Sequence, residues 1–124
     1  MIMAGLARLK RRPEFLAVAA SRRRWVAPGL ILQAARRPED SDLPPVPRIG
    51  FTASRKVGIA VVRNRARRRL KAAAEQVLPR HGALRFDYVA IARTETATRP
   101  FAELVADMTT AMERLNAKAG SGVR

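Results

Sequence analysis

Residues 48–71 read RIGFTASRKVGIAVVRNRARRRLK and contain the transition that decides the fold. The first seven residues alternate apolar side chains with small or polar ones, which is the period of a half-buried β-strand. Gly58 then turns the chain, and from residue 59 to residue 77 apolar side chains recur at helical spacing. The sequence therefore predicts a strand over 48–54 that leads directly into an amphipathic helix over 59–77.

The predicted helix carries its charge on one side. A narrow apolar stripe is formed by Ile59, Val62, Ala66, Leu70, Ala73 and Val77. The adjoining surface is basic, because residues 63–71 hold six Lys and Arg in nine positions and the first acid after them is Glu75. Like charges at helical spacing repel each other, so a solvated helix face normally mixes charge signs. A polyanion would supply the missing negative charge, so this helix predicts binding to nucleic acid.

The composition agrees with that prediction and limits the class of protein. The 124 residues are expected to form a single domain, with residues 1–7 and 120–124 flexible. The net charge is +15, and 18 of the 25 Lys and Arg fall within residues 1–71, against 4 Asp and Glu. An uneven charge of this size indicates an electrostatic contact surface. The chain contains no cysteine and shows no signal peptide or transmembrane stretch, which favours the cytoplasm.

The remaining elements follow from periodicity and from proline and glycine. A short helix is expected over 13–20, a strand over 29–35, a proline-rich loop over 37–47 and a buried strand over 86–92. Pro79 and Gly82 are expected to close the basic helix, and a last helix is expected from Pro100 to Gly120. This order predicts an α+β sandwich with one sheet face partly open.

Three other classes of function fit the sequence poorly. A protein that hydrolyses phosphodiesters needs clustered carboxylates or a His/Glu pair, whereas the ten acids are scattered and His81, the single histidine, is expected in a solvated turn. A helix-turn-helix DNA reader needs a helix before its recognition helix, and here a strand precedes it. A membrane-surface helix needs bulky apolar residues, and this stripe is mostly Ala and Val.

The strand and the basic helix together resemble the protein subunit of bacterial ribonuclease P. The resemblance rests on RIGFTASRKVG at 48–58 and on the Arg-Asn-Arg block that starts at Arg63. Two further segments are similar to the family: Arg8-Leu9-Lys10 followed by Glu14-Phe15, and residues 87–93. The resemblance covers residues 8–118.

The resemblance implies an αβββαβα sandwich related to the second domain of ribosomal protein S5, with a left-handed βαβ crossover. It also implies an accessory role in an RNA endonuclease. A catalytic RNA subunit, using bound Mg²⁺, removes the 5′ leader of precursor tRNA, while the protein binds that RNA and the leader. The protein would contribute no catalytic residue and no metal site, and its partners would be the catalytic RNA and precursor tRNA, not DNA or a membrane.

Two RNA-binding surfaces follow from this resemblance. Phosphates of the catalytic RNA are expected on Arg63, Asn64, Arg65, Arg67, Arg68 and Lys71, together with Arg55 and Lys56. The single-stranded leader is expected in a cleft between the first helix and the open sheet face, beside Phe15, Phe51, Ser54 and Trp25.

The aromatic residues of this cleft have alternative roles. Phe15 is either a stacking platform or a core anchor, Phe51 fits the core better, and Trp25 either stacks on RNA or anchors a strand. Ala19 stands one helical turn after Phe15, where family members often carry a second aromatic residue. Either the cleft is shallower here or Trp25 takes that place. The main alternative function is a ribosomal or general RNA-assembly protein outside any enzymatic complex.

Overall fold

The computed structural model describes residues 6–121, with side chains up to residue 117, and has the expected αβββαβα order within that range. The main elements are α1 Arg12–Ala20, β1 Arg24–Val26, β2 Leu30–Arg36, β3 Arg48–Thr52, α2 Ala60–His81, β4 Phe86–Ala92 and α3 Phe101–Ser121. Two short 3₁₀ helices, η1 Arg55–Val57 and η2 Thr94–Ala97, lead into α2 and α3.

The four strands form one sheet in the order β1-β2-β4-β3. β2 is antiparallel to both of its neighbours, whereas β3 and β4 are parallel. The connection β3–α2–β4 is therefore a βαβ unit between adjacent strands. The left-handed sense of this crossover stays a prediction.

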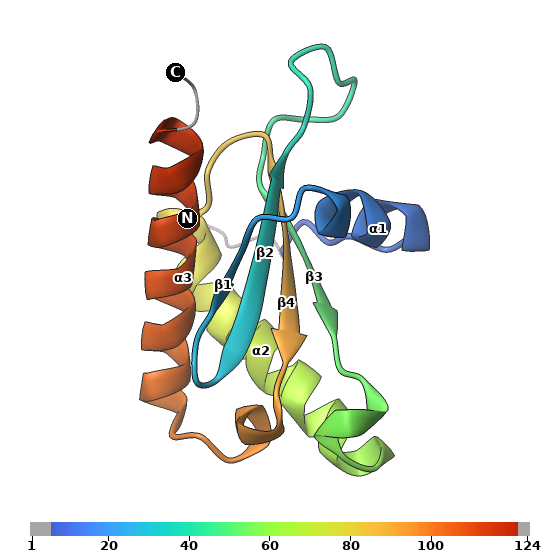
Figure 1. Ribbon diagram of the computed structural model, residues 1–124, viewed down its shortest axis with the longest axis vertical. Helices are drawn as coiled ribbons and strands as arrows, with labels where there is room; N and C mark the ends of the chain where they lie inside the picture. The colour runs from blue at the N-terminus through green and yellow to red at the C-terminus, as the bar shows by residue number, and fades with distance from the viewer. Residues whose placement is uncertain (1–5, 122–124) are drawn as a thin grey trace.

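Helices cover the two faces of the sheet unequally, and Figure 1 shows α1 and α3 on opposite sides of it. α2 and α3 pack on one face, where alternate residues of the strands join their apolar stripes in the main core. Among the fully buried residues there are Leu32 of β2, Ile49 of β3, Leu70 of α2 and Met108 of α3. β4 is buried on both faces, as its continuous apolar sequence predicts.

The short helix α1 covers only part of the other face. Leu9, Val18 and Val89 form a small second core beneath it, and Phe15 packs against them. Beyond α1 a row of residues crosses all four strands, because Ile31 pairs with both Val26 and Ile91, and Ile91 pairs with Thr52. These four side chains are partly or half exposed. The expected partly open sheet face is thus present beside α1.

The N-terminal segment extends the sheet past β3. The Ile49 N–H donates to the Ala7 carbonyl at 3.0 Å, and the Leu9 N–H donates to the Ile49 carbonyl at 3.1 Å. These bonds cover the edge of β3, whose backbone groups would otherwise be unpaired. The expected flexibility of residues 1–7 stays a prediction, although residue 7 is paired with β3, and residues 1–5 and 122–124 lie outside the described part.

Three details of α2 differ from expectation. Ile59 is 71% exposed because it precedes the first helical residue, so helical spacing does not apply to it. Pro79 lies inside the helix, on its exposed side, and the Gly82 N–H closes the last turn on the Leu78 carbonyl at 2.8 Å. His81 is the last helical residue, and its Nδ1 lies 3.5 Å from a carboxylate oxygen of Glu113 on α3. It is therefore not a solvated turn residue.

Smaller differences concern the ends of elements. The strand over β3 ends at Thr52, two residues earlier than expected, because η1 begins soon after it. α3 continues one residue past Gly120, which therefore does not end it. Among residues 6–121 no helix combines the length and apolar composition needed to cross a lipid bilayer.

Candidate RNA interface

The phase of α2 separates a buried side from a basic side. Ala66, Leu70 and Ala73 have no exposed surface, and Val77 is 2% exposed, so the predicted apolar stripe faces the sheet from its second residue onward. Asn64, Arg68 and Lys71 are exposed and Arg67 is partly exposed. The arginine-rich surface is thus presented by a helix that is anchored along its whole length.

A hollow of about 430 Å³ lies between this basic side and the N-terminal segment. We call it the α2 groove, and its lining residues are Arg8, Phe51, Asn64, Arg67, Arg68 and Lys71. The guanidinium carbon of Arg8 lies 5.0 Å from the centre of the Phe51 ring, which is a cation–π distance. Arg67 donates a hydrogen bond to the Asn64 amide oxygen, which fixes both side chains.

The charge of the α2 groove suits a polyanion. Its lining contains four cations and no carboxylate. Within residues 6–117, none of these four cations forms an ion pair with a carboxylate of the chain. Arginine forks match phosphate oxygens and stay charged at all physiological pH values. Phe51 adds an aromatic edge to the charge, although it is only 9% exposed and belongs mainly to the core.

The other predicted phosphate-binding residues lie outside the groove. Arg63 is partly buried, and its guanidinium donates a hydrogen bond to the Gly58 carbonyl at 3.4 Å. Arg65 is exposed. Arg55 and Lys56 are exposed on η1, directly before α2. These four residues extend the basic surface beyond the groove toward the first turn of α2.

One arginine of the run has a structural role. Arg69 donates hydrogen bonds to the carbonyls of Thr96 and Arg99, and so ties α2 to η2 and to the segment that starts α3. The sequence cannot distinguish it from its neighbours, because only the fold shows which arginines meet a backbone carbonyl. Arg8 is the converse case, because its place in the groove depends on the return of the N-terminal segment to β3.

The four residues expected around the leader do not share one cleft. Phe15 lies on the α1 side of the sheet, where its ring atoms would be 2.5 Å from a Cβ at position 50, so only glycine fits beneath it. Phe51 points to the opposite face, and Ser54 is exposed after the end of β3. Trp25 lies on β1, the other edge of the sheet, and pairs with Leu32 of the main core. Trp25 therefore does not replace the aromatic residue missing at Ala19, which is exposed.

The face beside Phe15 nevertheless forms a continuous surface. Phe15 packs with Ile91 against the second core, and Ile91 leads into the partly exposed row that ends at Val26. Three residues of this surface, Ile31, Ile91 and Thr52, are not singled out by the sequence. The only available signal was their alternation with buried neighbours, which does not say which face is left open.

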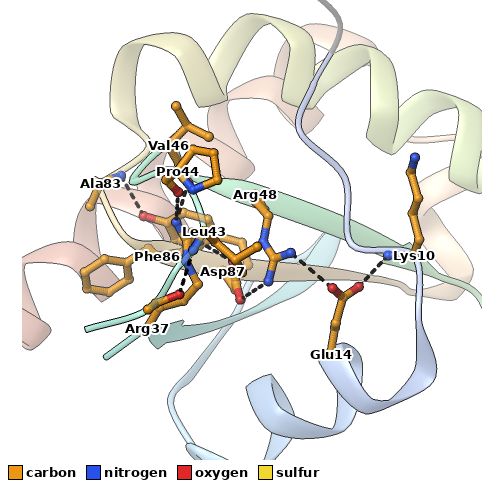
Figure 2. A network of polar contacts seen from close by, with 12 residues as sticks. Lys10, Glu14, Arg37, Leu43, Pro44, Val46, Arg48, Ala83, Phe86 and Asp87 are labelled. Atoms are coloured by element: carbon orange, nitrogen blue, oxygen red, sulfur yellow. Dashed lines mark hydrogen bonds and ion pairs between the residues drawn. The ribbon is translucent and has the colours of Figure 1, made fainter. Parts of the chain in front are cut away.

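A buried network of charges holds α1 in place (Figure 2). Asp87 of β4 accepts hydrogen bonds from Arg37 at 2.6 Å and from Arg48 of β3 at 2.8 and 2.9 Å. Arg48 also donates to Glu14 of α1 at 3.1 Å. The second terminal nitrogen of Arg37 donates to the carbonyls of Pro44 and Val46, so the same network fixes the loop before β3.

The network shifts the ionisation of its outer members. The backbone N–H groups of Arg11 and Lys10 donate to Glu14 at 2.9 and 2.8 Å and, with Arg48, hold the pKa of Glu14 below its ordinary value. Hydrogen bonding to Asp87 holds the pKa of Arg48 above its ordinary value. Both groups are therefore charged at neutral pH, and α1 is kept in the position that presses Phe15 onto Gly50.

The described residues offer little for metal-dependent hydrolysis. Among residues 6–117 no group of three or more His, Cys, Asp or Glu side chains could share a metal ion. Asp87, the most buried acid, is occupied by two guanidinium groups.

Comparison with known proteins agrees with these features. A sequence model of the Ribonuclease P family matches residues 3–116. The chain is 52% identical over 114 residues to the ribonuclease P protein component of Paramagnetospirillum magneticum, covering 92% of this chain and 86% of that protein. It is 45% identical over 114 residues to the same component of Ruegeria pomeroyi, covering 91% of this chain and 89% of that protein.

The fold comparison points to the same proteins at lower sequence identity. The ribonuclease P protein of Thermotoga maritima superposes with a TM-score of 0.70 at 20% identity, covering 86% of this chain and 96% of that one. A mutant of the Staphylococcus aureus ribonuclease P protein superposes with a TM-score of 0.72 at 18% identity. The match covers 88% of this chain and 87% of that one. The chain thus belongs to the bacterial ribonuclease P protein family, whose known role is the processing of tRNA 5′ ends.

Proposed function

We propose that this chain is the protein subunit of a ribonuclease P ribonucleoprotein in which the RNA performs the cleavage. The α2 groove binds phosphates of the catalytic RNA, and Arg55, Lys56, Arg63 and Arg65 extend that contact. The observation that carries the proposal is the groove itself, where four cations, none paired with a carboxylate within residues 6–117, meet an amide and an aromatic ring. Membership in the ribonuclease P family supports the catalytic RNA as that partner.

The 5′ leader of precursor tRNA binds on the opposite side of the sheet, along Phe15 and the open row from Thr52 to Val26. Single-stranded nucleic acid is held by stacking on aromatic and apolar side chains together with basic residues. Lys10, Arg11 and Arg12 supply positive charge at the start of α1, and all three are exposed. The two RNA ligands therefore occupy different faces and do not compete.

Mg²⁺ belongs to the RNA in this proposal. The protein's part is to neutralise phosphates and to hold the leader, which lowers the concentration of Mg²⁺ that the RNA needs for folding and substrate binding. We place the particle in the cytoplasm, in keeping with a chain that contains no cysteine.

The test is cleavage of a precursor tRNA at low Mg²⁺ by the catalytic RNA alone and with this protein added. We expect a mature 5′ end that depends on the protein. Arg68→Gln should reduce that stimulation, whereas Arg80→Gln, which removes an exposed arginine at the far end of α2, should not. If the protein alters neither the Mg²⁺ requirement nor precursor binding, the proposal is wrong. Co-purification with ribosomal RNA in place of one species of catalytic RNA would then support the RNA-assembly alternative.

A further inference from the structure

Trp25 occupies a place that neither the core nor the leader face explains. It is the single tryptophan of the chain and lies on β1, a three-residue strand at the edge of the sheet. Although its backbone partner Leu32 is fully buried, the Trp25 side chain remains 36% exposed. The guanidinium carbon of Arg114, on α3, lies 5.6 Å from its ring centre. A large aromatic side chain and a cation are thus displayed together at the surface.

The chain around Trp25 carries further positive charge. Arg22 and Arg24 are exposed, and Arg22 has a left-handed backbone conformation with φ of 61°. Ser21 stabilises this turn, because its hydroxyl lies 2.7 Å from both the Val18 and Ala34 carbonyls and accepts a hydrogen bond from the Arg23 N–H at 3.2 Å. The turn is therefore held in a fixed shape that displays its arginines.

These arginines lack carboxylate partners. Within residues 6–117, neither Arg22, Arg24 nor Arg114 forms an ion pair, although eight contacts of that kind occur elsewhere in the same part of the chain. Proteins hold unpaired nucleotides with basic side chains that contact the phosphates and with aromatic rings that stack on the bases. The exposed arginines and the indole of Trp25 provide both kinds of contact.

The location of this surface decides which RNA it meets. β1 and β3 are opposite edges of the sheet, so Trp25 is separated from the α2 groove by the width of four strands, about 15 Å. Trp25 shares the α2 and α3 side of the sheet with the groove, whereas Phe15 lies on the other side. An RNA that fills the α2 groove and passes over the outer surfaces of α2 and α3 reaches Trp25 on this side, whereas a leader along the open row meets β1 at Val26, on the other side of the sheet.

We propose that Trp25, Arg114, Arg22 and Arg24 form a second binding site for the catalytic RNA, which takes an unpaired nucleotide segment. This inference rests on the proposed function, because it assigns a second contact to the same partner. The two sites together clamp one large RNA at opposite edges of the sheet, so that each raises the effective concentration of RNA at the other.

The single tryptophan makes the proposal directly measurable. Acrylamide quenching of Trp25 fluorescence is recorded for the full chain during titration with the catalytic RNA, and binding is followed in parallel by gel shift. We expect the acrylamide quenching constant of Trp25 to fall at least about twofold as the catalytic RNA is added. The midpoint of this fall should equal the midpoint of binding in the gel shift. A second titration uses precursor tRNA without catalytic RNA, for which we expect no protection.

Two arginine variants separate a binding role from a structural one. Arg114→Gln should weaken binding of the catalytic RNA by about 10- to 150-fold, the range for loss of a hydrogen bond to a charged group, and should lower the salt slope by about 0.7–0.9. Arg80→Gln removes the same charge from an exposed position on the other long helix and should change neither quantity. Thermal melting of both variants should match that of the unmodified chain.

Each outcome has a definite meaning. Protection by the catalytic RNA together with weaker binding of the Arg114 variant supports the second site. Tight binding without protection of Trp25 overturns the second site and leaves the proposed function intact. Protection by precursor tRNA alone also overturns it, because the site then belongs to the substrate. Absence of any binding to the catalytic RNA overturns both proposals.

Discussion

Phe51 illustrates how one side chain serves the core and the interface together. Phe51 is 9% exposed and packs with the main core, yet it also lines the α2 groove, where the Arg8 guanidinium lies over its ring. Gly50, the residue before it, points to the opposite face and leaves room for Phe15. Two adjacent positions of β3 therefore prepare the two faces for two different RNA contacts.

Gly50→Ala should disturb the leader face selectively. A Cβ at position 50 would lie 2.5 Å from the Phe15 ring, so the ring must move away from the sheet. Overpacking of this kind costs about 1–3 kcal/mol of unfolding free energy. We expect weaker binding of precursor tRNA and unchanged binding of mature tRNA, which has no leader. Equal losses for both tRNAs would show that Phe15 does not contact the leader.

Neighbouring residues of α2 should respond in opposite ways. Leu70 has no exposed surface, so Leu70→Ala should lower the unfolding free energy by about 2–5 kcal/mol. Lys71 is exposed in the α2 groove, so Lys71→Gln should change stability by less than about 0.5 kcal/mol while weakening RNA binding. Denaturant titrations and RNA binding curves on both variants check this, and a stability loss at Lys71 would contradict the assignment.

At the scale of elements, Asp87 joins segments that are distant in sequence. The Asp87 carboxylate binds Arg37 at the start of the loop and Arg48 at the start of β3. Arg48 in turn donates a hydrogen bond to Glu14 of α1. Asp87 is 7% exposed, so its charge is unavailable to solvent. The loop, two strands and α1 thus depend on one acidic side chain.

Asp87→Asn should therefore be severely destabilising. The change leaves two guanidinium groups without their shared counter-charge, and breaking a buried ion pair from one side costs about 3–5 kcal/mol. Glu39→Gln is the matched control, because Glu39 pairs with Arg36 and Arg85 at an exposed site. This substitution should lower the free energy of unfolding by less than about 1 kcal/mol. Similar melting temperatures for the two variants would show that the network is dispensable.

The attachment of α1 should depend on pH through Glu14. Its pKa is lowered in the folded chain from an ordinary value of 4.5, chiefly by the Arg11 and Lys10 N–H groups. The stabilisation is thus fully present above that value and is lost as the pH falls through the folded-state pKa. Denaturant titrations should show Glu14→Gln less stable than the unmodified chain at pH 7, with the difference shrinking as the pH falls below 4.5. A difference independent of pH would exclude the charge as its source.

Sequence patterns predicted the elements where the burial signal was strong. β4 is found at the expected residues because its apolar run is buried on both faces, and the phase of α2 is right from Val62 onward. β1 was missed as a separate strand, since its three residues are all exposed and carry no burial pattern. The groove could be predicted only on its helical side, because Arg8 reaches it through a strand bridge between residues 41 positions apart. The position of Trp25 on the far edge strand could not be predicted for the same reason, since strand order is a long-range property.

At the scale of the whole molecule, Lys and Arg side chains gather at several separate places. They line the α2 groove, the start of α1 and the β1 edge, in a chain whose net charge is +15. Such a molecule is attracted to RNA before any specific contact forms, which raises the association rate.

Affinity for the catalytic RNA should therefore fall steeply with salt. The four cations of the α2 groove alone predict a slope of about −3 in log K against log salt. Arg68→Gln should make that slope shallower by about 0.7–0.9, whereas Arg80→Gln should leave it unchanged. Filter-binding curves at several salt concentrations measure both values. A slope near zero would mean that phosphate contacts contribute little.

The bridge between the N-terminal segment and β3 links recognition to local opening of the backbone. Residues 7–9 are held to the rest of the fold by few hydrogen bonds, so this edge opens more readily than the strands inside the sheet. Arg8 belongs to this segment and also to the groove, so RNA bound there resists the opening. The amide hydrogens of Leu9 and Ile49 should consequently exchange with deuterium more slowly in the complex, while those of the central strand β4 should keep the rate of the free protein.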